Sequence, residues 1–142
     1  MALYLDYAAA TPVDERVVAA MQPYWTELFY NPSSSTLAAK KVKMAVEESR
    51  ARVAHWVGAK PAEVIFTAGA TESINMAING IMRLHPRAEV LALSTEHDAV
   101  LAAAKQYSHK TIPVRKDGVI DMDAFKKLIG DTTVLVSAGY AN

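Results

Sequence analysis

The 142-residue sequence contains no cysteine, which excludes disulfide bonds, thiolate metal ligands and a cysteine nucleophile within it. It also carries no net charge, because its 15 Lys and Arg residues balance 15 Asp and Glu residues. A neutral balance gives the chain no overall attraction to nucleic acid or to an anionic membrane. No apolar run reaches the roughly 18–20 residues that a membrane-spanning helix needs. We therefore expect neither nucleic acid nor a membrane among its partners.

The N-terminus lacks the basic region and the continuous apolar stretch of a secretory signal peptide. Together with the absence of cysteine, this favours a cytoplasmic protein. The 4 histidines show no spacing typical of metal ligands, such as a pair four residues apart on one helix, and we expect no metal site. Apolar residues make up 51% of the sequence, which is enough for the core of a small folded domain.

Hydrophobic spacing predicts helices in the first part of the chain. Asp14 is suited to begin one helix, and residues 29–35 are rich in turn formers and predict a loop. The strongest helical pattern covers residues 36–57, and Gly58 is suited to end it. One predicted stripe along this helix consists of Val42, Val46, Ser49, Val53 and Trp56.

From residue 64 onward, predicted strands and helices alternate along the chain. The strands are predicted over residues 64–66, 89–93, 111–114 and 134–136. The helices are predicted over residues 71–84, from an N-cap at Asp98 to about residue 107, and from Asp121 or its neighbours to Leu128, with a turn at Asp117 and Gly118. This alternation is typical of an α/β domain with a largely parallel sheet and flanking helices. We divide the chain into an N-terminal segment, residues 1–35, and a partial α/β domain, residues 36–142.

The loop after the first predicted strand has the composition of a phosphate-binding loop. Gly69 allows a tight turn, Ala70 leaves the backbone open to a ligand, and Thr71 adds a hydroxyl beside the free N–H groups of a helix start. A carboxylate repels a phosphate, so the Glu72 side chain must point away from a bound phosphate. The alternative is an ordinary helix start, in which Thr71 is the N-cap and Glu72 interacts favourably with the helix dipole.

Three further side chains are candidates for a binding site. His97 lies between an apolar strand and a helix start, where an imidazole can stack on a flat ligand or move a proton near neutral pH. The alternative for His97 is a solvent-facing ring held by a helix cap. Asn31, before Pro32, is either a turn former or a substrate contact, and Asn142 is either a ligand contact or part of a frayed terminus.

Four segments, in order along the chain, resemble motifs of the pyridoxal phosphate (PLP)-dependent cysteine desulfurases, within the class V aminotransferase group. They are YLDYAAATP at residues 4–12, NPSS at 31–34, FTAGATESIN at 66–75 and TEHDAV at 95–100. One departure is Ala10, where the family pattern has threonine. The resemblance implies an incomplete large domain of a PLP-dependent transferase, with a loop near the cofactor in residues 1–35 and part of the cofactor-binding domain in residues 36–142.

The resemblance also implies roles for the matched residues. Ala70 and Thr71 would bind the cofactor phosphate, and His97 would stack on its pyridine ring and take part in proton transfer. Asn31 is retained as a substrate contact, and Asn142 matches the first Asn of the family's N-N-E-x-G segment. The implied reaction converts L-cysteine to L-alanine and passes the sulfur to an enzyme cysteine as a persulfide. A homodimer, sulfur-acceptor proteins and a role in iron–sulfur cluster assembly are implied as well.

None of the lysines lies in a motif that matches the family's covalent cofactor-binding lysine, and the sulfur-carrying cysteine is absent. We therefore expect the N-terminal part of a cysteine desulfurase, inactive by itself. One alternative is a selenocysteine lyase or another class V aminotransferase. Another is a naturally short, non-catalytic chain that binds or regulates, pairing with a separate C-terminal half. An exposed sheet edge or apolar face would favour self-association.

Overall fold

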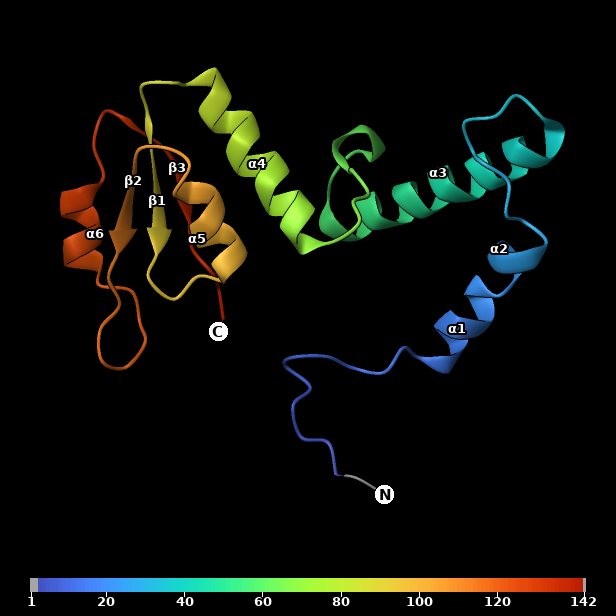
Figure 1. Cartoon of the computed structure of the whole chain (residues 1–142), viewed down its shortest axis with the longest axis horizontal. Helices are drawn as coiled ribbons and strands as arrows, with labels where there is room; N and C mark the ends of the chain where they lie inside the picture. Colours follow the sequence, from blue (N-terminus) through green and yellow to red (C-terminus); the bar gives the residue numbers. More distant parts are fainter. Residues whose placement is uncertain (1–2, 142) are drawn as a thin grey trace. The chain divides into compact units, whose positions relative to one another are not determined.

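The computed structural model describes residues 3–141, and the chain forms two compact units, Met1–Phe66 and Thr67–Asn142. The first unit contains α1 (Glu15–Met21), α2 (Pro23–Thr26), α3 (Leu37–Val57) and the short 3-10 helix η1 (Pro61–Glu63) (Figure 1). The second contains α4 (Ala70–Leu84), β1 (Glu89–Leu93), α5 (Asp98–Ala104), β2 (His109–Ile112), α6 (Met122–Leu128) and β3 (Thr133–Ser137). Among the described residues, no helix has both the length and the apolarity to cross a membrane.

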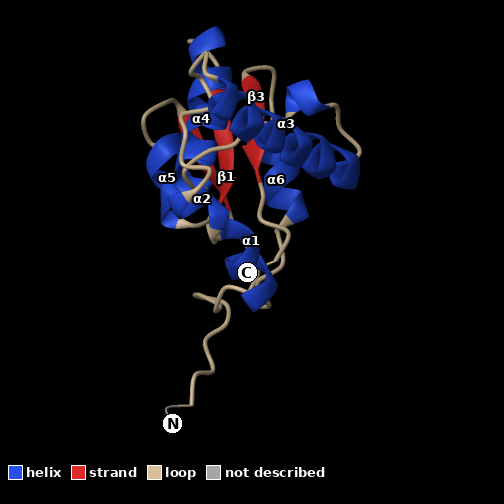
Figure 2. Cartoon of the chain, turned by 90° about the vertical axis from the view of Figure 1, so that its right-hand side faces the viewer, coloured by secondary structure: helices blue, strands red, loops and turns tan. Residues whose placement is uncertain are grey.

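The two helices that the sequence predicts in the first unit are found as α1 and α3, whereas α2 and the short 3-10 helix η1 were not predicted. The Asp14 side chain accepts a hydrogen bond from the Arg16 N–H at 2.8 Å and caps α1. In α3, the Thr36 hydroxyl accepts from the Ala39 N–H at 3.2 Å, and Gly58 ends the helix with a left-handed φ of 68°. The described chain before α1 carries neither helix nor strand (Figure 2).

The stripe predicted along α3 is only partly buried within this unit. Val42 is 6% exposed, whereas Val53 is 42% and Trp56 is 87% exposed. Helical spacing predicts which side chains share a face, but burial also requires a surface that packs against that face. The C-terminal half of the stripe has no such surface among the described residues of its unit.

Residues 64–66 do not form the predicted strand. The backbone is extended at Val64, but its carbonyl accepts a hydrogen bond from the Arg50 guanidinium at 2.6 Å instead of pairing with a strand. The same guanidinium lies 4.9 Å from the centroid of the Phe66 ring. The strand prediction is wrong here because an apolar run forms a β-strand only where a neighbouring strand supplies hydrogen bonds.

The second unit contains a three-stranded sheet in the order β2-β1-β3. Both β2 and β3 pair with β1 in parallel, which confirms the predicted α/β fold with a parallel sheet. The strand predicted over residues 111–114 is found slightly earlier: β2 is an edge strand and ends at Ile112, before Pro113. This placement agrees with proline's lack of an N–H donor for the sheet.

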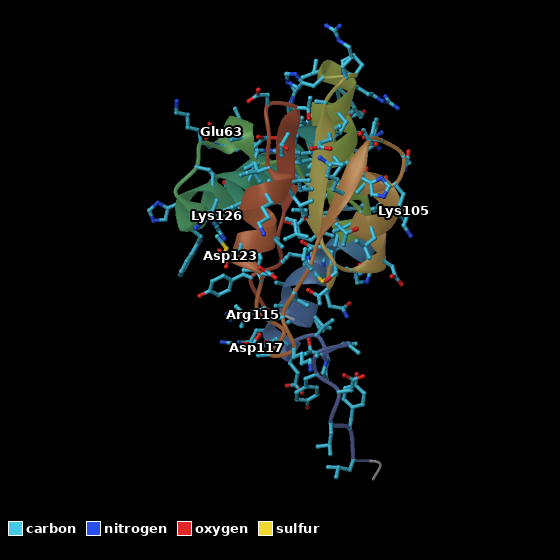
Figure 3. The ribbon with its side chains drawn as sticks, turned by 90° about the vertical axis from the view of Figure 1, so that its left-hand side faces the viewer. Glu63, Lys105, Arg115, Asp117, Asp123 and Lys126 are labelled. Carbon is cyan, nitrogen blue, oxygen red and sulfur yellow. The ribbon has the colours of Figure 1, made fainter. Side chains whose placement is uncertain are left out.

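A short hairpin follows β2. An isolated antiparallel bridge pairs Val114 with Ile120, and the turn between them contains Gly118 with a φ of 80°. Arg115 and Asp117 form an ion pair of 3.2 Å in this turn (Figure 3). The structure therefore confirms the predicted turn, in which glycine adopts the left-handed conformation at little steric cost.

The central strand β1 is buried throughout and separates two apolar clusters. On one face of the sheet, Val90 and Ala92 pack with residues of α4 and α5; on the other face, Leu91 and Leu93 pack with Ile112 and residues of α6 (Figure 1). The first cluster also includes Ile78, Met82, Val100, Ala103 and Ala104. Successive residues of a strand point to opposite faces, so a strand covered on both faces has an unbroken run of buried side chains.

Glu89 links all three strands at the amino-terminal edge of the sheet. Its Oε1 accepts hydrogen bonds from Lys110 Nζ on β2 at 2.8 Å and from the Thr133 hydroxyl on β3 at 3.3 Å. Glu89 is 6% exposed. The hydrogen bond from Lys110 lowers the pKa of the Glu89 carboxyl below its usual value of 4.5 and so stabilises the ionised form.

Replacing Glu89 with glutamine is expected to destabilise the second unit more at neutral pH than in acid. Because folding lowers the pKa of this carboxyl, its contribution is fully present above pH 4.5 and is lost as the pH falls through the lower folded-state pKa. Urea unfolding followed by circular dichroism, at about pH 7 and about pH 3, measures the difference between wild type and Glu89→Gln. Glu48→Gln, at an exposed position, is the control. An equal difference at both pH values would contradict the linkage.

Candidate functional site

The carboxyl-terminal edge of the parallel sheet is the place where a ligand site is expected. In open α/β sheets, ligands bind outside the carboxyl ends of the strands. The helix α5 begins just after β1 ends, and α4 runs back toward the start of β1. Both helices therefore begin at the level of this edge, α5 beside the strand ends and α4 farther out (Figure 1). The predicted residues Ala70, Thr71 and His97 all belong to these two helix starts.

The start of α4 is open to a ligand. Gly69 is its N-cap and offers no side-chain hydrogen bond to the helix. The first backbone hydrogen bond of the helix is donated by the Ser73 N–H to the Gly69 carbonyl, at 3.2 Å. The preceding N–H groups, including those of Ala70 and Thr71, are therefore not needed by the helix itself. Thr71 is the second residue of α4 and not its N-cap, so its hydroxyl is not used for capping.

The carboxylate of Glu72 is turned back toward the loop. Its Oε2 accepts a hydrogen bond from the Ala68 N–H at 2.6 Å. Behind it, the Thr67 and Ser73 hydroxyls are hydrogen-bonded to each other at 2.8 Å. A carboxylate held in this way satisfies a loop donor and leaves the N–H groups of residues 70 and 71 to an incoming anion. This donor set suits a phosphate group, which binds readily at the positive end of a helix.

His97 is the N-cap of α5. Its Nδ1 accepts a hydrogen bond from the Ala99 N–H at 3.1 Å, so in the neutral ring the proton is assigned to Nε2. The prediction that Asp98 caps this helix is wrong, because His97 has the extended backbone of a cap and Asp98 is already helical. The predicted alternative of a capping histidine is confirmed. The cap uses one ring nitrogen and leaves Nε2 and the ring faces for other contacts.

His97 also lines a hollow of about 400 Å³ at this edge. The other lining residues are Thr95, Glu96, Asp98, Gly139 and Ala141. They come from the loop after β1 and from the segment after β3, which the parallel pairing brings to the same edge of the sheet. The exposed imidazole of His97 therefore belongs to a polar depression and not to a flat surface.

The remaining candidates lie elsewhere. Asn31 belongs to the first unit, where its side-chain oxygen accepts from the Ser33 N–H at 2.9 Å and its carbonyl accepts from the Ser34 N–H at 3.0 Å. These bonds confirm Asn31 as a turn former, and its contact with substrate stays a prediction. Asn142 lies outside the described residues.

Two residues of the site were not among the sequence candidates. The Ser137 hydroxyl, at the end of β3, donates a hydrogen bond of 3.0 Å to Glu96 Oε1 in the loop after β1. The sequence could have indicated Glu96 and Ser137 only through the fact that each is a polar residue at or just after the end of a predicted strand. Their pairing also depends on which strands are neighbours, and the sequence does not specify that β3 lies beside β1.

A parallel α/β domain with an open helix start and a histidine-lined hollow at its carboxyl edge has the features expected of the class of proteins that bind phosphorylated cofactors or nucleotides. The model of the aminotransferase class-V family matches residues 3–142, and the chain belongs to this family. Class V aminotransferases are PLP-dependent enzymes, which agrees with the cofactor implied by the sequence motifs.

Within this family, the individual relatives that the chain resembles include cysteine desulfurases. Cysteine desulfurase IscS of Rickettsia felis is 40% identical over 148 residues, covering 99% of this chain and 36% of the relative. The mitosomal cysteine desulfurase of Encephalitozoon cuniculi is 40% identical over 150 residues, covering 99% of this chain and 35% of the relative. A solved NifS-like protein superposes with a TM-score of 0.89 at 32% identity, covering 96% of this chain and 39% of that protein.

These comparisons confirm the resemblance to cysteine desulfurases and the expected PLP-transferase fold. The chain spans 35–36% of the length of the two curated relatives.

Proposed function

We propose that this chain is the N-terminal part of a PLP-dependent cysteine desulfurase. The complete enzyme converts L-cysteine to L-alanine and transfers the sulfur to an enzyme cysteine as a persulfide. The observation that carries the proposal is the uncapped start of α4, which offers N–H groups and the Thr71 hydroxyl to a phosphate within the matching motif of residues 66–75. The relatives at 40% identity support cysteine as the substrate.

In the proposed site, the N–H groups of Ala70 and Thr71 and the hydroxyl of Thr71 hold the cofactor phosphate. When bound, PLP supplies an electron sink that weakens bonds of the amino acid substrate. His97 stacks on the cofactor ring, and its Nε2 is the nitrogen left to exchange a proton, because the Ala99 N–H engages Nδ1. Asn31 contacts the substrate.

The complete enzyme is a cytoplasmic homodimer that passes sulfur to acceptor proteins during iron–sulfur cluster assembly.

The 142-residue chain is inactive on its own under this proposal, because none of its lysines matches the family's cofactor-binding lysine. Lys105 follows the C-terminal end of α5, and Lys126 lies in the last turn of α6. The two lysines lie on opposite sides of the sheet, and both lie away from the turn of Arg115 and Asp117 (Figure 3).

A PLP titration followed by absorbance and borohydride trapping tests both statements. The 142-residue chain is expected to bind PLP reversibly, to trap none of it on lysine, and to form no alanine from cysteine. Stoichiometric trapping together with alanine formation would contradict the inactivity. The complete protein is expected to release alanine from L-cysteine. A requirement for a keto acid would instead indicate a transaminase, and a preference for selenocysteine would indicate a lyase of that kind.

A further inference from the structure

The hydrogen bond between Ser137 and Glu96 connects the two sides of the hollow that contains His97. One side is the loop after β1, residues 94–97, and the other is the segment after β3, residues 138–141. Glu96 Oε1 accepts from the Ser137 hydroxyl at 3.0 Å across these two sides. Its other oxygen, Oε2, lies 3.7 Å from the position that a Cβ on Gly139 would occupy. The Glu96 carboxylate is thus held between the two sides.

Two backbone hydrogen bonds of this loop lead to other strands. The Ser94 N–H donates to the Ile112 carbonyl of β2 at 2.9 Å, and the Glu96 N–H donates to the Leu93 carbonyl of β1 at 3.1 Å. These bonds fix the backbone of the loop to β1 and β2, whereas the Glu96 side chain fixes it to β3. The backbone of His97 follows directly, so this side-chain bond links the His97 loop to the end of β3 beyond the point where the pairing of β1 with β3 stops.

We propose that Glu96 is a positioning residue, which binds Ser137 and thereby holds the His97 ring at a fixed distance from the segment after β3. The hydrogen bond is charge-assisted, because a carboxylate accepts it, and such bonds contribute more than those between neutral groups. When it is lost, the two sides of the hollow separate more easily and His97 no longer presents its ring in one place. The inference rests on the proposed function insofar as PLP is the ligand beneath that ring.

Nuclear magnetic resonance of the 142-residue chain tests the positioning without any activity. The ring nitrogens of His97 are identified with a His97→Gln variant among the 4 histidines. Ser137→Ala and Glu96→Ala are expected to shift the His97 ring signals and to speed exchange of the Ala99 amide, whose N–H bonds to that ring. They are also expected to weaken PLP binding by roughly three- to tenfold, the loss of one partly exposed hydrogen bond to a charged group.

Conservative variants separate positioning from a general structural effect. Ser137→Thr keeps the hydroxyl donor and the charged acceptor, so it is expected to restore the His97 signals and PLP binding. Glu96→Gln keeps an oxygen acceptor without the charge, so it is expected to restore them in part. Ser94→Ala makes the same chemical change in the same loop, where the hydroxyl bonds to no other residue in the range 3–141, and is expected to change neither.

Two results would overturn the proposal. One is a Ser137→Ala chain with unchanged His97 signals. The other is a loss of signal dispersion throughout β1 and β3 that Ser137→Thr does not restore. If the unsubstituted chain binds no PLP, the proposed function fails, while the His97 signals still decide whether Glu96 positions that ring.

Discussion

Replacing Leu91 with alanine is expected to lower the free energy of unfolding of the second unit by about 2–5 kcal/mol, the range for truncating a large buried side chain. Leu91 is 0% exposed and lies in the middle of β1. It belongs to the cluster with Leu93 and Ile112, against which Phe125 and Leu128 of α6 pack. The substitution therefore leaves a cavity between the central strand and the helix that covers it.

Urea unfolding followed by circular dichroism and by exchange of the β1 amides measures this loss. Tryptophan fluorescence is unsuitable, because both tryptophans, Trp25 and Trp56, belong to the first unit. Leu84→Ala is the matched control, since it makes the same change at a position that is 79% exposed. Similar losses in the two variants would contradict the assignment of Leu91 to the core.

Replacing Ala70 with proline is expected to weaken PLP binding by roughly tenfold, the effect of losing one hydrogen bond to a charged group. Ala70 is the first residue of α4, a position where proline is well tolerated because its missing N–H has no partner within the helix. The substitution thus removes one of the two N–H groups assigned to the phosphate while the helix is kept. The preceding residue, Gly69, is extended, as proline requires.

Two comparisons sharpen this experiment. Pyridoxal, which has no phosphate, is expected to bind the wild type and Ala70→Pro equally. Leu37→Pro removes the corresponding N–H at the start of α3 and is expected to leave PLP binding unchanged. Circular dichroism checks that the helix content of each variant is retained. Unchanged PLP binding by a folded Ala70→Pro chain would refute the phosphate assignment.

The sequence predicted those elements whose signals are local. The helix starts at Asp14 and Asp121, and the left-handed glycine at position 58, are recognised from side-chain chemistry within a few residues. The strand over residues 89–93 was predicted from its apolar run and is buried at every position. Local signals fail when the outcome depends on a distant partner. Within residues 3–141, the apolar run at residues 64–66 pairs with no strand, and Trp56 stays 87% exposed.

The candidate site was predictable to a similar extent. The helix starts that contain Thr71 and His97 follow from short motifs, and the structure places both in the second unit. The tie between Glu72 and Ala68 was foreseen only as a requirement that this carboxylate turn away from a phosphate. The hydrogen bond between Glu96 and Ser137 joins residues 41 positions apart and depends on the order of the strands in the sheet. The spacing of apolar residues along the sequence does not specify that order.

The central place of β1 also determines the order in which the sheet forms. Glu89 on β1 meets Lys110 on β2 across 21 residues and Thr133 on β3 across 44 residues. Loop-closure entropy costs about 0.6 kcal/mol more for each doubling of the loop, so the contact of β1 with β2 forms at the smaller cost. During synthesis β2 is also made before β3. The two sides of the hollow around His97 therefore meet when β3 docks on β1, so this hollow is among the last features of the sheet to form.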